Sequence, residues 1–219
     1  MPNQLSQSKF LIPTMIVIAL LAAATGFFVS VKQAQLEQQQ AAQRQIPGLF
    51  WPEPRQLQSF SIVDHDNQAF ELADMKGKWS LVFFGYTNCP DICPITLSVL
   101  AESYPAMKSG TDNLQVLFAS VDPDRDNTDQ LAEYVQYFDE EFIGVGGPVT
   151  AMNSFTRQLG VAYFLNNEED KENYLVDHSA SVYLIDPEAR LVGKLSPPHN
   201  PEMIKQRFAQ IKEFINENS

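Results

Sequence analysis

The sequence has few basic residues and only two cysteines. Among its 219 residues, 15 are Lys or Arg and 27 are Asp or Glu, so the formal net charge is −12. This balance argues against a nucleic-acid-binding protein, because phosphate backbones require a basic face. Two cysteines are too few for a disulfide-scaffolded domain. The sequence also has no Gly-rich phosphate loop, so it gives no support to nucleotide binding.

The acidic residues are concentrated in one segment. Between Thr111 and Glu141 there are nine Asp or Glu residues and a single basic residue, Arg125. The simpler interpretation is a solvated face that keeps the protein soluble. The alternative is an acidic surface that steers a cationic partner or a metal ion towards the protein.

The N-terminal part contains a long apolar run. Residues 10–31 carry no charge, and as a helix these 22 residues would span about 33 Å, enough for a bilayer core of about 30 Å. The sequence therefore predicts a transmembrane anchor at 10–31. Lys9 precedes the run and residues 1–9 contain no acid, which predicts a cytoplasmic N-terminus with the rest of the chain translocated. A cleaved signal peptide ending near Ala22–Ala24 is the alternative, but the run exceeds the usual apolar core of about 7 to 15 residues.

A polar segment separates the anchor from the folded part. Residues 33–45 are rich in Gln and Ala, and Pro47, Pro52 and Pro54 follow within a short stretch that favours extended chain. We expect a spacer over 32–57 and a single domain over 58–219. Apolar residues make up 44% of the chain, including 15 Phe, so a full core can form.

Strand and helix patterns alternate along this domain, with hairpins at its ends. Apolar–polar alternation predicts a β-hairpin over 58–72 around the turn-type cluster 64–67. Further strands are expected at 81–85, 114–121, 142–145, 181–186 and 190–195, an additional hairpin at 161–165 and 173–176 around the acidic loop 166–172, and helices at 94–107, 128–138, 150–160 and 202–215. Alternating strands and helices predict an α/β sheet, with antiparallel edges from the hairpins.

The two cysteines, Cys89 and Cys93, lie where the buried strand 81–85 turns into a helix. A helix N-terminus lowers a thiol pKa and favours the thiolate, which attacks disulfides and binds metals. Three residues separate the pair. If the segment is helical, the spacing places both side chains on one face with Cβ atoms about 5–6 Å apart. That separation suits two sulfurs on one soft metal ion better than a disulfide. Because Pro90 and Pro94 can disturb the first turn, a redox-active or a static disulfide stays open.

A soft metal ion held by the two cysteines would need a third ligand, because two thiolates alone satisfy Cu(I) poorly in an exchange site. An imidazole is a natural third ligand. The chain has three histidines, and we interpret His65 and His199 as exposed loop residues. His178 comes just before strand 181–186. If that strand runs antiparallel to 81–85, His178 lies beside the cysteines; the alternative is a capping or core histidine. The neighbouring Asp177 is then expected to orient the imidazole ring.

Three stretches of the sequence resemble the Sco/SenC family of copper chaperones. They are Phe83–Pro94 (FFGYTNCPDICP), Val121–Asp126 (VDPDRD) and Tyr174–Ser179 (YLVDHS), and the order, spacing and single anchor are also similar. The resemblance implies a thioredoxin-like fold with inserted elements. It further implies that Cys89, Cys93 and His178 bind copper, as Cu(I) or Cu(II).

The resemblance also implies a biological role. The copper would be delivered to the CuA centre of cytochrome c oxidase subunit II, and a copper donor and a thiol reductant would be further partners. No Arg- and Ser-rich transit peptide is evident. We therefore expect a single-pass protein of a bacterial inner membrane with its domain in the periplasm. We interpret Asp122, Arg125 and Asp126 in the second stretch as a network at a loop and helix start that contains a local ion pair.

Two functions from different classes remain at this point. A metallochaperone needs His178 as much as the cysteines. A thiol–disulfide oxidoreductase that keeps the cysteines of the CuA site reduced needs Cys89 and Cys93 as a redox pair but tolerates loss of the histidine. A peroxiredoxin would share the fold, yet the sequence shows no activating environment for a peroxidatic cysteine, and fold alone does not carry function.

Overall fold

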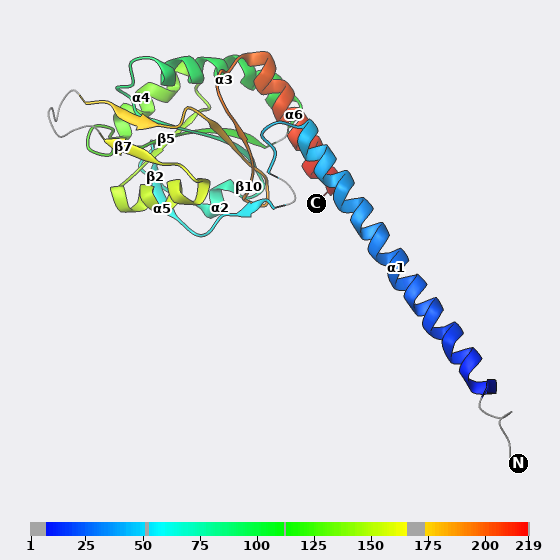
Figure 1. Cartoon of the computed structure of the whole chain (residues 1–219). Coiled ribbons are helices and arrows are strands. Elements are labelled where there is room, and N and C mark those ends of the chain that lie inside the picture. The colour runs from blue at the N-terminus through cyan, green and yellow to red at the C-terminus, as the bar shows by residue number, and fades with distance from the viewer. Residues whose placement is uncertain (1–7, 51–52, 112, 166–173, 219) are drawn as a thin grey trace, which may run out of the picture. The chain divides into compact units, whose positions relative to one another are not determined.

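The computed structural model describes residues 8–50, 53–111, 113–165 and 174–218. The chain divides into two compact units, Met1–Gln45 and Ile46–Ser219 (Figure 1).

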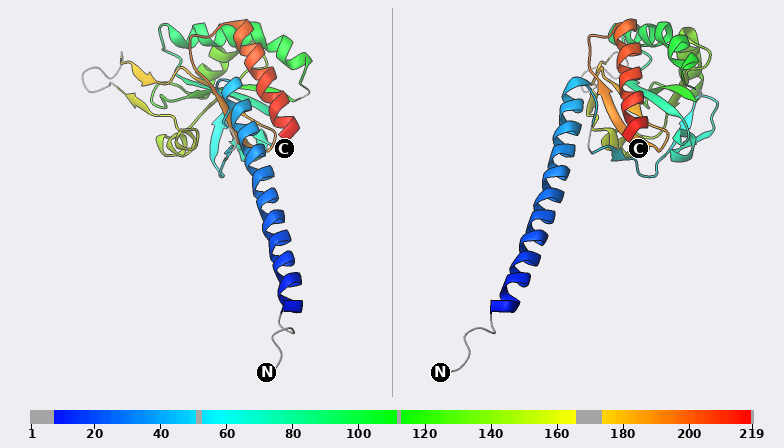
Figure 2. Two further views of the ribbon diagram at one scale, coloured as in Figure 1. Left: turned by 45° about the vertical axis from the view of Figure 1, so that its right-hand side comes forward. Right: turned by 90° about the vertical axis from the view of Figure 1, so that its right-hand side faces the viewer.

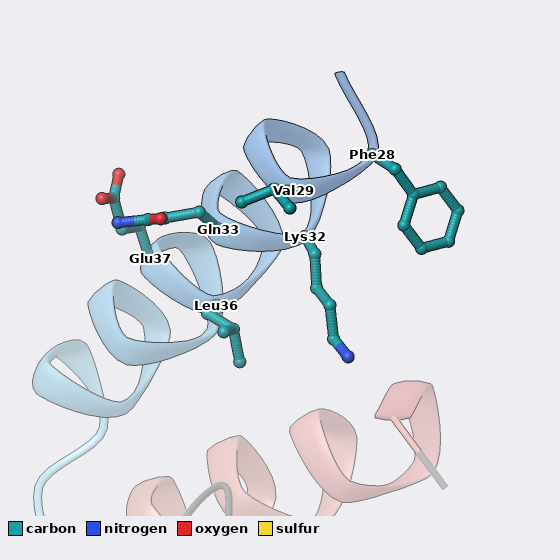
Figure 3. Close-up of a pocket in the computed structure, with 6 residues that line it drawn as sticks. All are labelled: Phe28, Val29, Lys32, Gln33, Leu36 and Glu37. Carbon is teal, nitrogen blue, oxygen red and sulfur yellow. The ribbon is translucent and has the colours of Figure 1, made fainter. Parts of the chain in front are cut away.

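The first unit is one helix, α1, Ser8–Gln45. Its segment Ile18–Gln38 is long and apolar enough to cross a membrane, and it is the single such helix within the described residues. Figure 3 shows the apolar Phe28, Val29 and Leu36 next to Lys32 on the exposed surface of this helix. The helix continues beyond the predicted anchor to Gln45, because the Gln- and Ala-rich segment contains no helix-breaking residue.

The second unit begins at Ile46, ahead of the position 58 expected from the sequence. Leu49 and Leu57 are buried, and Leu49 forms a β-bridge with Gly193. Gly48 permits this approach: it has a φ of 93°, and a Cβ atom there would lie 2.5 Å from the carbonyl oxygen of Lys194. The short strand β1 (Arg55–Gln56) then joins the sheet.

The core of the second unit is an eight-stranded sheet with the order β1-β10-β9-β4-β5-β6-β2-β3. Its central strands are parallel, β4 with β5 and β5 with β6, and the remaining pairs are antiparallel. The bounds are β2 Ser61–Asp64, β3 Ala69–Glu71, β4 Trp79–Gly85, β5 Leu114–Ser120, β6 Ile143–Gly146, β9 Val182–Ile185 and β10 Arg190–Leu195. The predicted α/β sheet with antiparallel edges is confirmed, and β4 and β5 are buried along their whole length, as their continuous apolar sequences indicated.

Side-chain hydrogen bonds to the backbone stabilise one hairpin turn and the start of one helix. In the hairpin of β2 and β3, the Asp64 carboxylate accepts hydrogen bonds from the backbone N–H groups of Asp66 and Gln68 at 3.0 and 2.8 Å. Asn127 caps α4 (Thr128–Phe138), and its Oδ1 accepts from the N–H of Gln130 at 3.0 Å.

The other helices are α2 Leu72–Met75, α3 Ile92–Ser109, α5 Val149–Leu159 and α6 Pro201–Asn218. Helices α3 and α6 pack side by side on one side of the sheet, and α5 lies on the other (Figures 1 and 2). Helix α3 begins at Ile92, earlier than the predicted start at Pro94, so it includes Cys93 in its first turn. This difference matters for the site, because it gives the two cysteines different backbone environments.

The predicted additional hairpin forms a separate two-stranded sheet. Strand β7, Tyr163–Leu165, pairs antiparallel with β8, Val176–His178. The acidic loop 166–172 predicted between them lies outside the described residues. Strand β8 leads directly into β9 of the main sheet, so this hairpin is anchored beside the end of β4.

Gly85, the last residue of β4, gives a test of the packing beside the cysteines. A Cβ atom there would lie 2.7 Å from the Phe118 ring and 2.8 Å from Cys93 Sγ. Both neighbours are fully buried. We therefore expect Gly85→Ala to lower the free energy of unfolding by about 1–3 kcal/mol through overpacking, measured by urea denaturation of reduced residues 46–219.

Gly110→Ala is the matched control, because the nearest heavy atom to a Cβ at that position is 3.9 Å away. This second variant should not lose stability. Equal stability of the two variants would contradict the packing described for Gly85.

Candidate metal centre

Two segments far apart in the sequence meet at one edge of the sheet. Strand β4 ends at Gly85 and runs through the loop 86–91 into α3, while β8 leads into β9. Strands β4 and β9 are antiparallel with Phe83 opposite Val182. The residues that follow β4 therefore lie beside those that precede β9. This is the strand arrangement on which the predicted proximity of His178 to the cysteines depended, and it is confirmed.

Cys89, Cys93 and His178 converge at this edge. Their ligand atoms all lie within 4.8 Å of one another, and among the residues that the structure describes they form the one such group. Cys93 Sγ lies 3.4 Å from Nε2 of His178. Cys93 is fully buried and Cys89 is 9% exposed. The cluster is thus open to solvent chiefly along the side of Cys89 and the half-buried His178.

The two sulfurs do not meet through the helical spacing considered above. Cys89 lies in the loop, where its N–H donates to the Tyr86 carbonyl oxygen at 3.2 Å, and only Cys93 lies in α3. A turn before the helix, rather than one helical face, brings the sulfurs together. Both cysteines are free thiols in this structure.

The two thiols differ strongly in acidity. The pKa of Cys89 is lowered to about 4, first by a hydrogen bond from the Cys93 thiol and then, against the effect of burial, by His178 and the backbone N–H groups of Asp91 and Cys93. The pKa of Cys93 is raised, by donating that bond, by burial and by the neighbouring Cys89 charge. One thiolate next to one thiol is therefore the resting form at neutral pH.

The His178 ring is held from two sides. Its Nδ1 lies 3.2 Å from the carbonyl oxygen of Ser179, and this contact orients the ring so that Nε2 faces the sulfurs, 3.4 Å from Cys93 Sγ. The rings of Phe83 and Tyr86 contact the imidazole edge-on, with centroids 6.1 and 6.0 Å away. Asp177 precedes His178 on the same strand, where successive side chains point to opposite faces. The orienting contact seen here comes from Ser179, and a role for Asp177 stays a prediction.

Asp126 fixes the loop that carries Cys89. Its carboxylate accepts hydrogen bonds from the N–H and hydroxyl of Thr87 at 3.0 and 2.6 Å, and from the Ser120 hydroxyl at 2.6 Å. Burial raises the pKa of Asp126, while these hydrogen bonds oppose the rise. The carboxylate therefore connects the cysteine loop to the end of β5. Asp126 was singled out in the sequence, but this role was not predicted.

Asp122 and Arg125 form the local ion pair that the sequence suggested. Arg125 Nε donates to the buried Asp122 Oδ2 at 2.6 Å. The guanidinium also lies 3.5 Å from the centroid of Tyr174 and 5.6 Å from that of Tyr86, and the Tyr174 hydroxyl donates to Asp122. Tyr174 precedes β8, so the cluster connects the segment that carries His178 with the loop that carries Cys89. Apart from the presence of Tyr174 in the third stretch, no pattern in the sequence predicts this contact.

The other two histidines lie elsewhere and are more buried than expected. His65 Nδ1 accepts a hydrogen bond from the N–H of Gly144 at 2.9 Å, and its side chain is 10% exposed. His199 Nε2 lies 2.8 Å from the Ala180 carbonyl oxygen and is half-buried. Each therefore has a structural contact with the backbone, and the interpretation of both as solvent-exposed loop residues is corrected.

Comparisons with known proteins agree on one family. The SCO1/SenC family model matches residues 52–213. Protein SCO1 homolog 1, mitochondrial, from Arabidopsis thaliana is 38% identical over 147 residues, which cover 66% of this chain and 43% of that protein. This chain thus spans less than half the length of that relative.

Two solved structures give the same result for the fold. Arabidopsis thaliana ScoI with copper bound is 35% identical, with a TM-score of 0.66, and the match covers 73% of this chain and 98% of that one. Bradyrhizobium japonicum ScoI with copper bound is 30% identical, with a TM-score of 0.63, and the match covers 72% and 98%. The predicted thioredoxin-like α/β fold is confirmed, and this chain belongs to the SCO1/SenC family.

Proposed function

We propose that this protein is a membrane-anchored copper chaperone. It binds copper through Cys89, Cys93 and His178 and delivers it to the CuA centre of cytochrome c oxidase subunit II. The observation that carries the proposal is the convergence of these three side chains, with ligand atoms within 4.8 Å of one another.

The donor set fits copper as cargo. The two thiolate sulfurs are soft ligands that favour Cu(I), the imidazole is a ligand that also suits copper, and the three together would leave the ion three-coordinate. Such a site can accept an incoming ligand before it loses one of its own. Cys89 and His178 lie towards solvent while Cys93 is buried, so a partner's ligand would approach from their side.

Relatives and the N-terminal helix support the wider proposal. The Arabidopsis and Bradyrhizobium ScoI structures contain copper. Helix α1 would serve as the anchor, with the N-terminus in the cytoplasm and the domain in the periplasm of a bacterium. A copper donor and a thiol reductant would be further partners, because an oxidising compartment converts free thiols to disulfides.

A Cu(I) titration tests the site directly. Reduced residues 46–219 would compete anaerobically with a chromophoric Cu(I) chelator. We expect one-to-one binding that weakens at least about tenfold in His178→Ala, or about 1.4 kcal/mol, because the imidazole ligand is lost.

His65→Ala is the matched control, since His65 contacts Gly144 in another part of the sheet. Its affinity for Cu(I) should equal that of the wild type. Binding that is unchanged in His178→Ala would remove His178 from the site, and no competitive binding by the wild type would refute the chaperone proposal.

A second function, thiol–disulfide exchange, has one specific observation in its favour. The Cys89 pKa of about 4 makes this residue a thiolate at neutral pH. That thiolate could attack a partner's disulfide, and Cys93, after losing its proton, would then close a Cys89–Cys93 disulfide and release the partner as a dithiol. An external thiol reductant would have to restore the pair.

The acidity of Cys89 predicts an unusual pH profile for alkylation. An ordinary thiol with a pKa of about 8.5 gains thiolate by up to about 100-fold between pH 6 and 8. A group whose pKa is lowered to about 4 is already ionised over this range. We therefore expect iodoacetamide labelling of Cys89, followed by mass spectrometry, to change less than about twofold between pH 6 and 8 and to fall only as the pH approaches 4.

Variants of Cys93 identify the cause. Cys93→Ala removes the hydrogen-bond donor and should shift the labelling profile to higher pH. Cys93→Ser retains a hydroxyl donor and should shift it less. A wild-type profile that rises steeply between pH 6 and 8 would show that Cys89 is not ionised in the way described.

A further inference from the structure

A hollow of about 310 Å³ lies beside the loop that carries Cys89. Thr87 and Asn88 of that loop form one wall. Residues of α4 form the other, and they are Gln130, Glu133, Tyr134 and Tyr137. None of these six residues is a ligand in the copper site proposed above. Thr87 contributes only by helping to hold the loop in place.

An exposed aromatic ring borders this hollow. Tyr137 is 84% exposed, and its ring rests edge-on against Phe138 with centroids 5.2 Å apart. The rings of Tyr134 and Phe138 are 5.4 Å apart, and those of Tyr134 and Phe118 are 5.1 Å apart, so a row of aromatic rings leads from the core to the surface. An open aromatic face attracts a cation through its quadrupole.

Among the described residues that line the hollow, the one charged side chain is the acidic Glu133. Glu133 is exposed, and no basic side chain among the described residues forms an ion pair with it. The one basic residue of the segment 111–141, Arg125, already contacts Asp122 and Tyr174. The carboxylate and the open ring together fit a ligand that is cationic and flat.

A guanidinium group meets these requirements better than an ammonium group. Its planar fork can pair with a carboxylate through two parallel hydrogen bonds and can stack on an aromatic ring at the same time. The other exposed acids near α4, including Asp129 and Glu140, would raise the local concentration of a basic partner.

We propose that the hollow between the cysteine loop and α4 is a docking site for an exposed arginine of a partner protein. The guanidinium pairs with Glu133 and stacks on Tyr137. Since Asn88 of the hollow is the residue before Cys89, an arginine seated there holds the partner's chain next to the thiol pair. The proposal concerns an interaction surface and stands whether or not copper is the cargo.

The test uses a minimal probe with a neutral counterpart. N-acetyl-arginine amide and N-acetyl-citrulline amide would be titrated into ¹⁵N-labelled full-length protein in zwitterionic detergent micelles. Citrulline has nearly the same shape as arginine but no charge. We expect saturable amide shifts confined to Thr87, Asn88 and the α4 residues, with arginine binding at least about fivefold tighter than citrulline and more weakly as ionic strength rises.

Two variants and a matched control make the test specific. Glu133→Gln and Tyr137→Ala should each weaken arginine binding at least about fivefold, whereas Glu140→Gln, an exposed acid outside the hollow, should not. Spectra of the free variants show whether each is folded. Equal binding of the two probes, shifts located elsewhere, or a loss in Glu140→Gln as large as that in Glu133→Gln would overturn the proposal.

Discussion

The pairing of β4 with β9 is the constraint on which the rest of the site depends. Strand β4 has β5 on one side in parallel and β9 on the other in antiparallel orientation. The chain therefore leaves β4 and enters β9 at the same sheet edge, so that a residue at 178 meets residues at 89 and 93. A shift of β9 by one residue would turn Val182 and its neighbours to the opposite face. Since all four residues of β9 are buried, such a shift would place each side chain in space packed for a different one, and the position of His178 depends on this core packing.

The sheet edge alone does not define the site, because the cysteine loop carries little regular structure. Buried polar contacts supply the missing order: Asp126 holds Thr87 and Ser120 together, and Asp122 connects Arg125 with Tyr174. Buried carboxylates of this kind are stable only when fully hydrogen-bonded. The same residues that satisfy these carboxylates also set the distance between the loop with Cys89 and the segment with His178.

The sequence was informative where periodicity and burial agree, and less so where a contact depends on tertiary packing. The strands of the main sheet other than β1, which lies in the predicted spacer, and the bounds of α4 followed from apolar patterns and the Asn127 cap. The position of His178 could be predicted because it needs only strand direction. The two cysteines do not lie on one helical face, as the spacing would have placed them in a helix, because α3 starts between them at Ile92. The contact of Arg125 with Tyr174 spans 49 positions of sequence, and no local pattern encodes it.

The asymmetry of the two cysteines follows from the same architecture. Cys93 lies in α3 and is fully buried against Gly85, whereas Cys89 lies in the loop and is 9% exposed. The hydrogen bond that the Cys93 thiol donates to Cys89, together with burial and the nearby Cys89 charge, raises the pKa of Cys93 and keeps it protonated. A soft cation bound here would have to displace the Cys93 proton, while Cys89 is already a thiolate. If the proposed copper exchange takes place here, the more exposed sulfur of Cys89 would be the first contact for an incoming ion, and the Cys93 sulfur would bind the ion after losing its proton.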